Sequence, residues 1–595
     1  MSSTPSKFTR FWQELKRRRV IHVITVYASA AFVLIELVNN LTEPLNLPHG
    51  LATIVIVVLA IGFPLAIVLS WIYDLTGEGF ERTKPLEDGL DVKTAKVPNA
   101  WKIATYVSFI VIVGLLTFNI IGGTKGLKAG DIQSLLVLPF DNFTGDDQLD
   151  YITAGMHSSL IGDMGQIGGL RIISKTTANI YKNLSMSLPE IATQANADAI
   201  VEPSVMCYGD SVCLQIKVIT PFPEEKQIWM GEYKAEKSQI LNVYNTVCKQ
   251  IAEEIKVTLS PSEEQVLAQA KTVNPDAYDA YLRGQYYWDQ LTPEALQMAL
   301  EYFNKAIDID PNWAPPYAGV ALFWIGVRQM GLAPSSITVP NIYKYLNKAI
   351  ELEPNSANTH YTDALAAVWT GYDWDKGESE FLKVIELNPS DANSHAYYAH
   401  LLLFLKRPDE ALAQAQLALE LDPLNPLIQG LVAVVYGHLG NFDQAIELAR
   451  KIIQVVPNHP LALGTLWEVN YYQGNYEESF RYCGKLFNLG EENTELILDT
   501  YEKQGNIAAV EKVITMLEAI PDEQIPVSAA IRIAVLYHLV DRTDKALDIL
   551  ETILEEQGPD LPYATTGVKS FEKLENEPRF LAICEKMGLP PPATH

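Results

Sequence analysis

The chain has 595 residues, of which 72 are acidic and 45 basic, and 48% are hydrophobic. At roughly 100–200 residues per domain, this length predicts several folded units. The formal net charge of −27 argues against a nucleic-acid-binding protein, which needs clustered Lys and Arg, and five cysteines are too few for a disulfide-built scaffold. Residues 1–130 carry 13 basic and 9 acidic side chains, so the acidic excess lies beyond residue 130.

The first part of the chain contains three apolar stretches long enough to cross a bilayer, which takes about 20 helical residues. We therefore expect a membrane anchor over 20–122 with transmembrane helices at about 20–41, 51–73 and 103–121. Basic residues precede the first stretch and separate the second from the third. By the positive-inside rule, segment 1–19 is then cytoplasmic and residues from about 125 onward are extracytoplasmic.

From 131 to 258 the pattern changes to short apolar runs separated by turn signals. The expected elements, in order, are strand 135–140, helix 150–166, strand 170–173, helix 188–195, a strand from 199 and a closing helix at 238–258. Alternating residues on both sides of Gly209 and Asp210 predict a β-hairpin. Strands that alternate with helices indicate a small α/β domain with a mixed sheet.

Cys207 and Cys213 flank the turn of the predicted hairpin. If Val205 and Leu214 face inward, strict alternation turns Cys207 inward and Cys213 outward, which argues against a disulfide. A bridge would need a different strand register, and the oxidation state of the pair stays open. The other cysteines, which we expect to be buried small hydrophobic residues, are Cys248, Cys483 and Cys584.

The same region resembles the TolB N-terminal-like domain, a domain type related to the FlgO fold. The resemblance covers 131–258 and rests on segments 138–146 (LPFDNFTGD), 170–176 (LRIISKT) and 202–205 (EPSV), with Gly155 ahead of a helix. Pro203 departs from the glycine that is usual in that family. The segment 11–20 (FWQELKRRRV) is also similar to the membrane entry of such bacterial proteins. The resemblance implies a non-enzymatic sensor or scaffold of the bacterial inner membrane, with residues from about 125 onward in the periplasm.

One motif recurs through the rest of the chain. Each copy is a predicted helix end in which apolar residues alternate mainly with acidic ones, followed by a proline. The prolines stand at 311, 354, 389, 423 and 457, so most steps are 34 or 35 residues. A period of 34, with small residues at fixed places and a proline after each second helix, is typical of tetratricopeptide repeats. We expect a solenoid of stacked helix pairs over 260–560 and a capping segment over 561–595. The fold class is thus mainly α: three transmembrane helices, a small α/β domain and an α-solenoid.

The tetratricopeptide resemblance implies a concave groove lined by the first helix of each repeat. Exposed aromatic residues there would supply contact area for a protein or peptide partner. The alternative is that many of these residues serve inter-repeat packing or are idle surface. The inward positions carried over from the family are Tyr361, Leu365, Trp369, Asn393, His400, Phe404, Val434, His438, Glu468, Tyr471 and Tyr472.

Motifs of catalysis and cofactor binding are missing from the sequence. There is no HExxH, no GxxxxGK[ST], no GxGxxG and no GxSxG. The acidic turn that begins at Asp141 resembles a calcium loop only faintly, because its twelfth position is Ile152 instead of a glutamate. We therefore predict no catalytic, cofactor-binding or metal-binding residues and expect that the protein is not an enzyme.

The leading hypothesis from sequence is a membrane-anchored scaffold whose extracytoplasmic repeat groove binds a protein partner. A first alternative is a transmembrane signalling receptor that relays partner binding to a separate cytoplasmic effector. A second is an enzyme with an unrecognised site in the α/β domain. Neither the partner nor the oligomeric state follows from the sequence.

Overall fold

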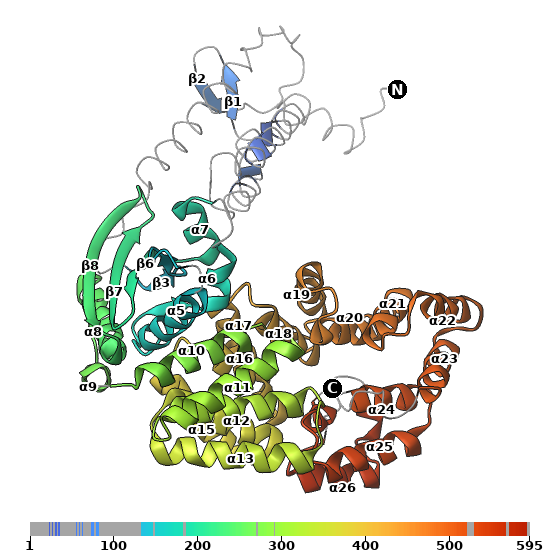
Figure 1. The fold of residues 1–595 in the computed structure, drawn as a ribbon. Helices are drawn as coiled ribbons and strands as arrows, with labels where there is room; N and C mark the ends of the chain where they lie inside the picture. Colours follow the sequence, from blue (N-terminus) through green and yellow to red (C-terminus); the bar gives the residue numbers. More distant parts are fainter. Residues whose placement is uncertain are drawn as a thin grey trace. The chain divides into compact units, whose positions relative to one another are not determined.

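The computed structural model describes residues 132–146, 149–181, 186–268, 272–290, 292–520, 529–566 and 571–591, together with short stretches between 23 and 82. The chain divides into two compact units, Met1–Lys125 and Gly126–His595. In the first unit, β1 (Tyr73–Thr76) and β2 (Gly79–Arg82) pair as an antiparallel hairpin. The second unit contains the α/β domain and the helical repeats, coloured from green to red in Figure 1.

The prediction of three transmembrane helices is wrong for the residues that the structure describes. None of the helices described there is both long and apolar enough to cross a bilayer. Tyr73, the last residue of the predicted second span, begins strand β1. The ranges 20–41 and 51–73 are described only at scattered positions, and 1–19 and 103–121 lie outside the described residues. The expected contact with a lipid bilayer depended on these helices, so the described residues do not support it either.

The α/β domain is built on one mixed sheet with the strand order β5-β3-β6-β7-β8, and β4 pairs with β6 at the side. Strand β3 runs parallel to β5 and β6, whereas β6, β7 and β8 are antiparallel. The strands are β3 (Ser134–Val137), β4 (Asp141–Asn142), β5 (Arg171–Ile173), β6 (Ala199–Tyr208), β7 (Ser211–Thr220) and β8 (Lys226–Glu236). The expected hairpin is β6–β7, and the sequence interpretation missed β8.

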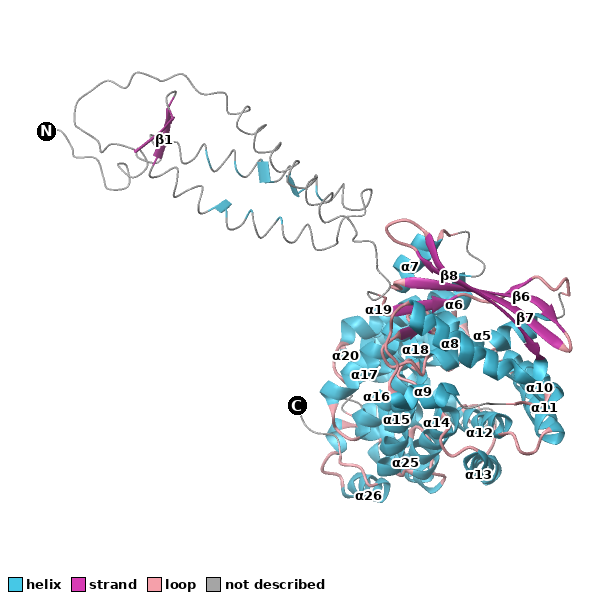
Figure 2. Cartoon of the chain, turned by 90° about the vertical axis from the view of Figure 1, so that its left-hand side faces the viewer, coloured by secondary structure: helices cyan, strands magenta, loops and turns pink. Residues whose placement is uncertain are grey.

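Helices cover both faces of the parallel part of this sheet, and Figure 2 shows α5 and α8 beneath the long strands β6, β7 and β8. Leu135 and Val137 belong to the apolar cluster under α5 and α8, whereas Leu136 between them faces α6 and α7. Both faces of β3 are thus buried, which explains its unbroken apolar run. The domain's helices are α5 (Asp150–Met164), α6 (Lys175–Tyr181), α7 (Leu188–Ala195), α8 (Ile240–Glu254) and, after it, α9 (Pro261–Ala268).

A β-bulge overturns the sequence argument against a disulfide in this hairpin. The register pairs Val205 with Leu214 and then Cys207 with Cys213, so Met206 is one extra residue in β6. A bulge residue shifts the alternation that follows it by one. Both cysteines therefore lie on the same face, where they form a disulfide. As expected, the remaining three cysteines are free and buried.

The repeat part consists of helices that pack in consecutive antiparallel pairs, from α10 with α11 to α24 with α25. The first half contains α10 (Pro275–Trp288), α11 (Pro293–Ile309), α12 (Ala314–Gln329), α13 (Ser335–Leu352), α14 (Ala357–Ala366), α15 (Trp374–Leu387), α16 (Ala392–Phe404) and α17 (Pro408–Leu421). The second half contains α18 (Pro426–His438), α19 (Phe442–Val455), α20 (Pro460–Tyr472), α21 (Tyr476–Leu486), α22 (Glu491–Gln504), α23 (Asn506–Glu518), α24 (Ala530–Leu539) and α25 (Thr543–Glu555). A π-helical turn, Ala367–Gly371, extends α14.

The recurring prolines act as the sequence suggested. Helices α11, α13, α15, α17 and α19 each end two residues before one of them, because a residue ahead of proline avoids the helical region. Small residues let paired helices approach closely: Ala411 and Ala445 are fully buried between them. The expectation of a tetratricopeptide-like solenoid is therefore confirmed.

The α/β domain and the first repeats share one apolar core. The cluster beneath the sheet continues through Leu282 of α10 and Phe303 of α11 to Val320 of α12. A Cβ atom added at Gly155 of α5 would lie 2.5 Å from a Leu282 methyl carbon, so only glycine allows this approach. These contacts join the domain and the first repeats into one packed body.

The chain after α25 turns back along the repeats. It forms the short 3-10 turns Leu561–Thr565 and Glu572–Leu574 and then α26 (Pro578–Met587), which packs on α25. The indole of Trp374, at the start of α15, donates a 2.8 Å hydrogen bond to the Met587 carbonyl. The predicted capping segment 561–595 thus contacts the middle of the array as well as its last helix pair.

Candidate partner-binding groove

The candidate groove is the face built from the first helices of successive pairs. Helix α12 contacts α14, α16 contacts α18, and α18 contacts α20. All eleven predicted partner-binding residues lie on this row, on α14 and its π-helical extension, α16, α18 and α20. The tetratricopeptide pattern therefore placed all eleven residues on first helices of the pairs, and their binding of a partner stays a prediction.

Only some of the predicted residues come together. His400, Val434, His438 and Glu468 line one cavity of about 140 Å³. Trp369 and Phe404 lie next to it, and both are almost completely buried. These six residues form the part of the predicted groove that the structure brings together.

The other five predicted residues take no part in this cavity. Leu365 is in the hydrophobic core, Asn393 is half-buried, and Tyr361 packs against Tyr397 with 6.3 Å between ring centroids. Tyr471 packs on the rings of its neighbours in α20 and α21, Tyr472 and Tyr476. Tyr361 thus packs between repeats, as the sequence left open, whereas the rings of Tyr471 and Tyr472 pack within their own helix pair.

The centre of the groove is occupied by Tyr563, a residue of the chain's own carboxyl-terminal part. Its ring lies 4.9 Å from the ring of Phe404, 5.6 Å from His400 and 5.8 Å from His438, measured between centroids. The side chain of Trp369 also hydrogen-bonds Tyr563. We call these four residues, Trp369, His400, Phe404 and His438, the Tyr563 socket. Four predicted partner-binding residues thus surround a tyrosine from a distant part of the chain. Tyr563 follows His438 by 125 positions and the other three residues by 159 or more.

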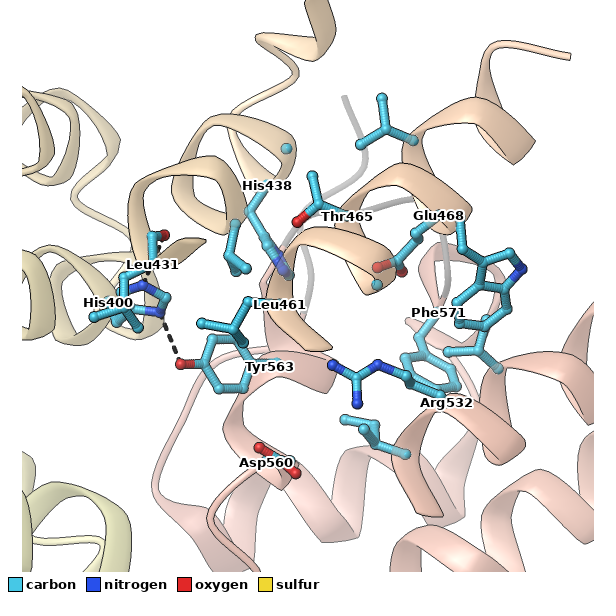
Figure 3. Close-up of a pocket in the computed structure, with 17 residues that line it drawn as sticks. His400, Leu431, His438, Leu461, Thr465, Glu468, Arg532, Asp560, Tyr563 and Phe571 are labelled. Atoms are coloured by element: carbon cyan, nitrogen blue, oxygen red, sulfur yellow. Dashed lines mark hydrogen bonds between the residues drawn. The ribbon is translucent and has the colours of Figure 1, made fainter. Parts of the chain in front are cut away.

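The hydrogen bonds of His400 define its tautomer (Figure 3). Its Nε2 lies 3.0 Å from the Leu431 carbonyl, which can only accept, so this nitrogen carries the proton. Its Nδ1 must then accept the hydrogen bond of 2.7 Å from the Tyr563 hydroxyl. Burial lowers the pKa of His400 to about 3 and that of His438 to about 4. Both imidazoles are therefore neutral at pH 7, and burial also raises the pKa of Tyr563 well above its ordinary value.

The residues flanking Tyr563 are held mainly through their main-chain carbonyls. Arg328 donates to the Glu556 and Gln557 carbonyls at 3.1 and 2.6 Å, and Tyr372 donates to that of Gly558 at 2.6 Å. Beyond Tyr563, the contacts are from Lys406 to the Thr565 carbonyl and from His438 Nδ1 to the Thr566 carbonyl at 3.2 Å. Burial lowers the pKa of Lys406 to about 8. The inner helices therefore bind residues 556–566, hereafter the 556–566 segment, as they would bind a peptide.

The cavity lies beside Tyr563, between α18, α20 and α24. Apolar side chains that include Leu461, Val535 and Phe571 form much of its wall, and Glu468, Arg532 and Asp560 direct polar groups toward it (Figure 3). Burial raises the pKa of Asp560 to about 6, against the opposing effect of the Arg532 charge. An apolar cavity with a few convergent polar groups is the usual form of a small binding site.

Sequence reasoning missed the residues that come from outside the first helices of the middle repeats. Arg328 and Lys406 lie at helix ends, Arg532 in a degenerate repeat, and Tyr563 in a segment without periodicity. One signal was available: residues 558–563 (GPDLPY) set an aromatic residue in a proline-rich stretch directly after the last paired helix. Among the described residues, no group of three or more His, Cys, Asp or Glu side chains could hold a metal ion.

Comparison with known families identifies the class of the repeats. Residues 380–413, which run from the middle of α15 through α16 into the start of α17, match the tetratricopeptide repeat family. The helix pairs and the 34-residue period agree with this match, so the array is a tetratricopeptide repeat array. No such match tests the resemblance of 131–258 to the TolB N-terminal-like domain, which stays a prediction.

The curated relatives have names that indicate regulatory proteins, and this chain is similar to each of them over only part of its length. A putative adenylate cyclase 3 of Rhizobium meliloti is 25% identical over 250 residues, 40% of this chain and 40% of that protein. The transcriptional regulator HilA of Salmonella typhimurium is 24% identical over 299 residues, 49% of this chain and 51% of that protein. The chain thus spans about half or less of the length of these relatives. Among solved structures, a human IFIT1 dimer with m7Gppp-AAAA is 16% identical with a TM-score of 0.34, over 53% of this chain and 77% of that one.

Proposed function

We propose that this protein is a non-enzymatic scaffold whose tetratricopeptide groove binds a segment of a partner protein. The observation that carries the proposal is that the groove already binds a peptide segment, the chain's own residues 556–566, chiefly through main-chain carbonyls. Carbonyl groups are common to every protein, so the same donors can bind another chain.

The cavity beside the 556–566 segment supplies room for a side chain of the partner. Its volume of about 140 Å³ exceeds the space of several water molecules. Leu461 and Val535 can bury an apolar group there, and Arg532 and Asp560 add polar groups to the same wall. Such convergent polar groups in an apolar pocket give orientation and specificity to a bound ligand.

Site-specific photo-crosslinking tests this proposal. A photoreactive amino acid at Val434, which lines the cavity, is compared with one at Val455, which is 77% exposed at the end of the neighbouring helix α19. We expect crosslinks from Val434, but not from Val455, to map to one segment of one protein. Leu461→Trp, which fills the cavity, should reduce that yield. Crosslinks that are equal at both positions, or insensitive to Leu461→Trp, would contradict the proposal.

A second candidate function is signal reception, in which binding at the groove is relayed to a separate effector. It is favoured by the names of the curated relatives, a putative adenylate cyclase and a transcriptional regulator, which share 250 to 299 aligned residues with this chain. The test is affinity capture with residues 1–19 as bait. Reproducible recovery of a cyclase or regulator would support this function, and its absence would leave scaffolding alone.

We also propose that residues from about 125 onward are extracytoplasmic. The Cys207–Cys213 disulfide supports this location, because such bonds persist in oxidising compartments and are rare in the cytosol. Alkylation of protein taken directly from cells, followed by peptide mass spectrometry, should find this pair oxidised and Cys248, Cys483 and Cys584 reduced. A fully reduced pair would argue for the cytoplasm.

A further inference from the structure

The connection between α25 and α26 is unusual in length and in placement. It runs from residue 556 to 577, and its described residues include two short 3-10 turns. Connections longer than about 12–15 residues are uncommon in compact domains and are usually either functional loops or linkers. Its first half lies in the groove, where Tyr563 fills the socket and Thr565 and Thr566 contact α16 and α18 through Lys406 and His438. A segment that only covers the last helix pair of a repeat array would not need to enter the groove.

The contacts of the 556–566 segment are of a kind that another chain can reproduce. Arg328, Tyr372 and Lys406 each donate to a main-chain carbonyl, so they recognise backbone carbonyls and not particular side chains. Specific recognition comes from the ring and hydroxyl of Tyr563. The ring packs edge-on against Phe404 and His400, and the hydroxyl donates to His400 Nδ1.

We propose that the 556–566 segment is an intramolecular ligand and that the partner is a protein segment that places a tyrosine in the same socket. The inference rests on the proposed function and adds the partner's chemistry and its competition with the chain's own tyrosine. The partner supplies main-chain carbonyls and one tyrosine between them, as the 556–566 segment does with its 3-10 turn at Leu561–Thr565. Phenylalanine is a poor substitute, because it leaves His400 Nδ1 buried without a donor.

The test uses the full-length chain and a fluorescent peptide of residues 556–566 (EQGPDLPYATT), measured by anisotropy. Tyr563→Ala empties the socket, and we expect this variant to bind the peptide at least tenfold more tightly than the wild type. A peptide with phenylalanine in place of the tyrosine should bind roughly fivefold more weakly. The double variant Tyr563→Ala/His400→Ala is the control and should lose the preference for tyrosine. A folded Tyr563→Ala variant that binds no peptide would overturn the inference.

If Tyr563→Ala does not fold, hydrogen exchange in the wild-type chain tests the same inference. Added peptide at millimolar concentration should speed the exchange of amides in 556–566 and leave those of α16 and α18 unchanged. Absence of this effect would overturn the inference. The outcomes also separate the two proposals: a partner crosslinked at Val434 without any peptide competition supports groove binding and rejects displacement. Peptide competition without a crosslinked partner rejects only the proposed function.

Discussion

The α/β domain and the 556–566 segment both pack against the repeat array, but they do so by different means. The domain shares a continuous apolar core with the first repeats, and Gly155 of α5 is shaped to fit Leu282. The segment is held mainly by side chains that donate to its carbonyls and by one tyrosine. Close apolar packing accepts one shape, whereas carbonyl recognition accepts many sequences. We therefore expect the contact of the α/β domain with the first repeats to be permanent and the contact of the 556–566 segment with the groove to be exchangeable.

The largest expected effect is at Asp422, in the turn between α17 and α18, where hydrogen bonds join the α/β domain to the array. Its buried carboxyl group accepts hydrogen bonds from Ser174, Thr177 and Asn425 at 2.6 to 2.8 Å. Asp422→Ala leaves these donors without their partner and should lower the free energy of unfolding by about 3 kcal/mol, measured by urea denaturation. Asp409→Ala, at an exposed position of the same helix pair, is the control and should change it little. Equal effects would show that the domain is only loosely attached.

Acid should weaken the exchangeable contact. His438 has an ordinary pKa of 6.5 when unfolded and about 4 when folded, so between these values the unfolded chain binds more protons. The contribution of His438 to the free energy of unfolding is complete above pH 6.5. About 3 kcal/mol of it is lost as the pH falls toward 4. His400 acts in the same direction. Thermal unfolding from pH 7 to pH 4 should show a smaller acid loss in His438→Gln than in the wild type, and an identical profile would contradict this.

Removal of one carbonyl-binding group should release the segment without disturbing the sheet. Arg328 is 5% exposed and donates to the Glu556 and Gln557 carbonyls. Arg328→Met should cost about 2 kcal/mol and should speed proteolytic cleavage between residues 556 and 566. Arg450→Met breaks an exposed ion pair with Glu478 and should cost well under 1 kcal/mol. Unchanged cleavage in Arg328→Met would mean that other contacts hold the segment.

The smallest expected effect is that of the Tyr563 hydroxyl alone. Tyr563→Phe keeps the ring in the socket but removes the hydrogen bond to His400, which should cost about 1 kcal/mol. The measurement is the midpoint of thermal unfolding compared with that of Tyr537→Phe, whose hydroxyl donates to Glu518 in the neighbouring repeat. A neutral substitution would show that the socket recognises an aromatic ring and not tyrosine.

Much of the fold followed from local patterns in the sequence. The 34-residue period and its prolines predicted the helix pairs and where their second helices end, because both signals act within one repeat. Single insertions and distant contacts escaped the same reasoning. Met206 bulges and reverses the alternation on which the cysteine argument depended. Trp369 and Phe404 were predicted as exposed groove residues, but both are buried, and Tyr563, 159 positions beyond Phe404, packs on the Phe404 ring. The transmembrane prediction rested on the length and apolar character of three stretches, and the described helices do not support it.

The bond between Arg328 and the end of α25 affects how the array unfolds. In a simple solenoid each repeat contacts only its neighbours, so the ends can fray independently. Here α12 binds a turn 228 positions further along the chain, and Trp374 similarly binds the end of α26. Loss of either end removes contacts from the other, so the repeats should melt together in one cooperative transition. Contacts over so large a sequence separation also raise the contact order, and this array should fold more slowly than an open one of equal length.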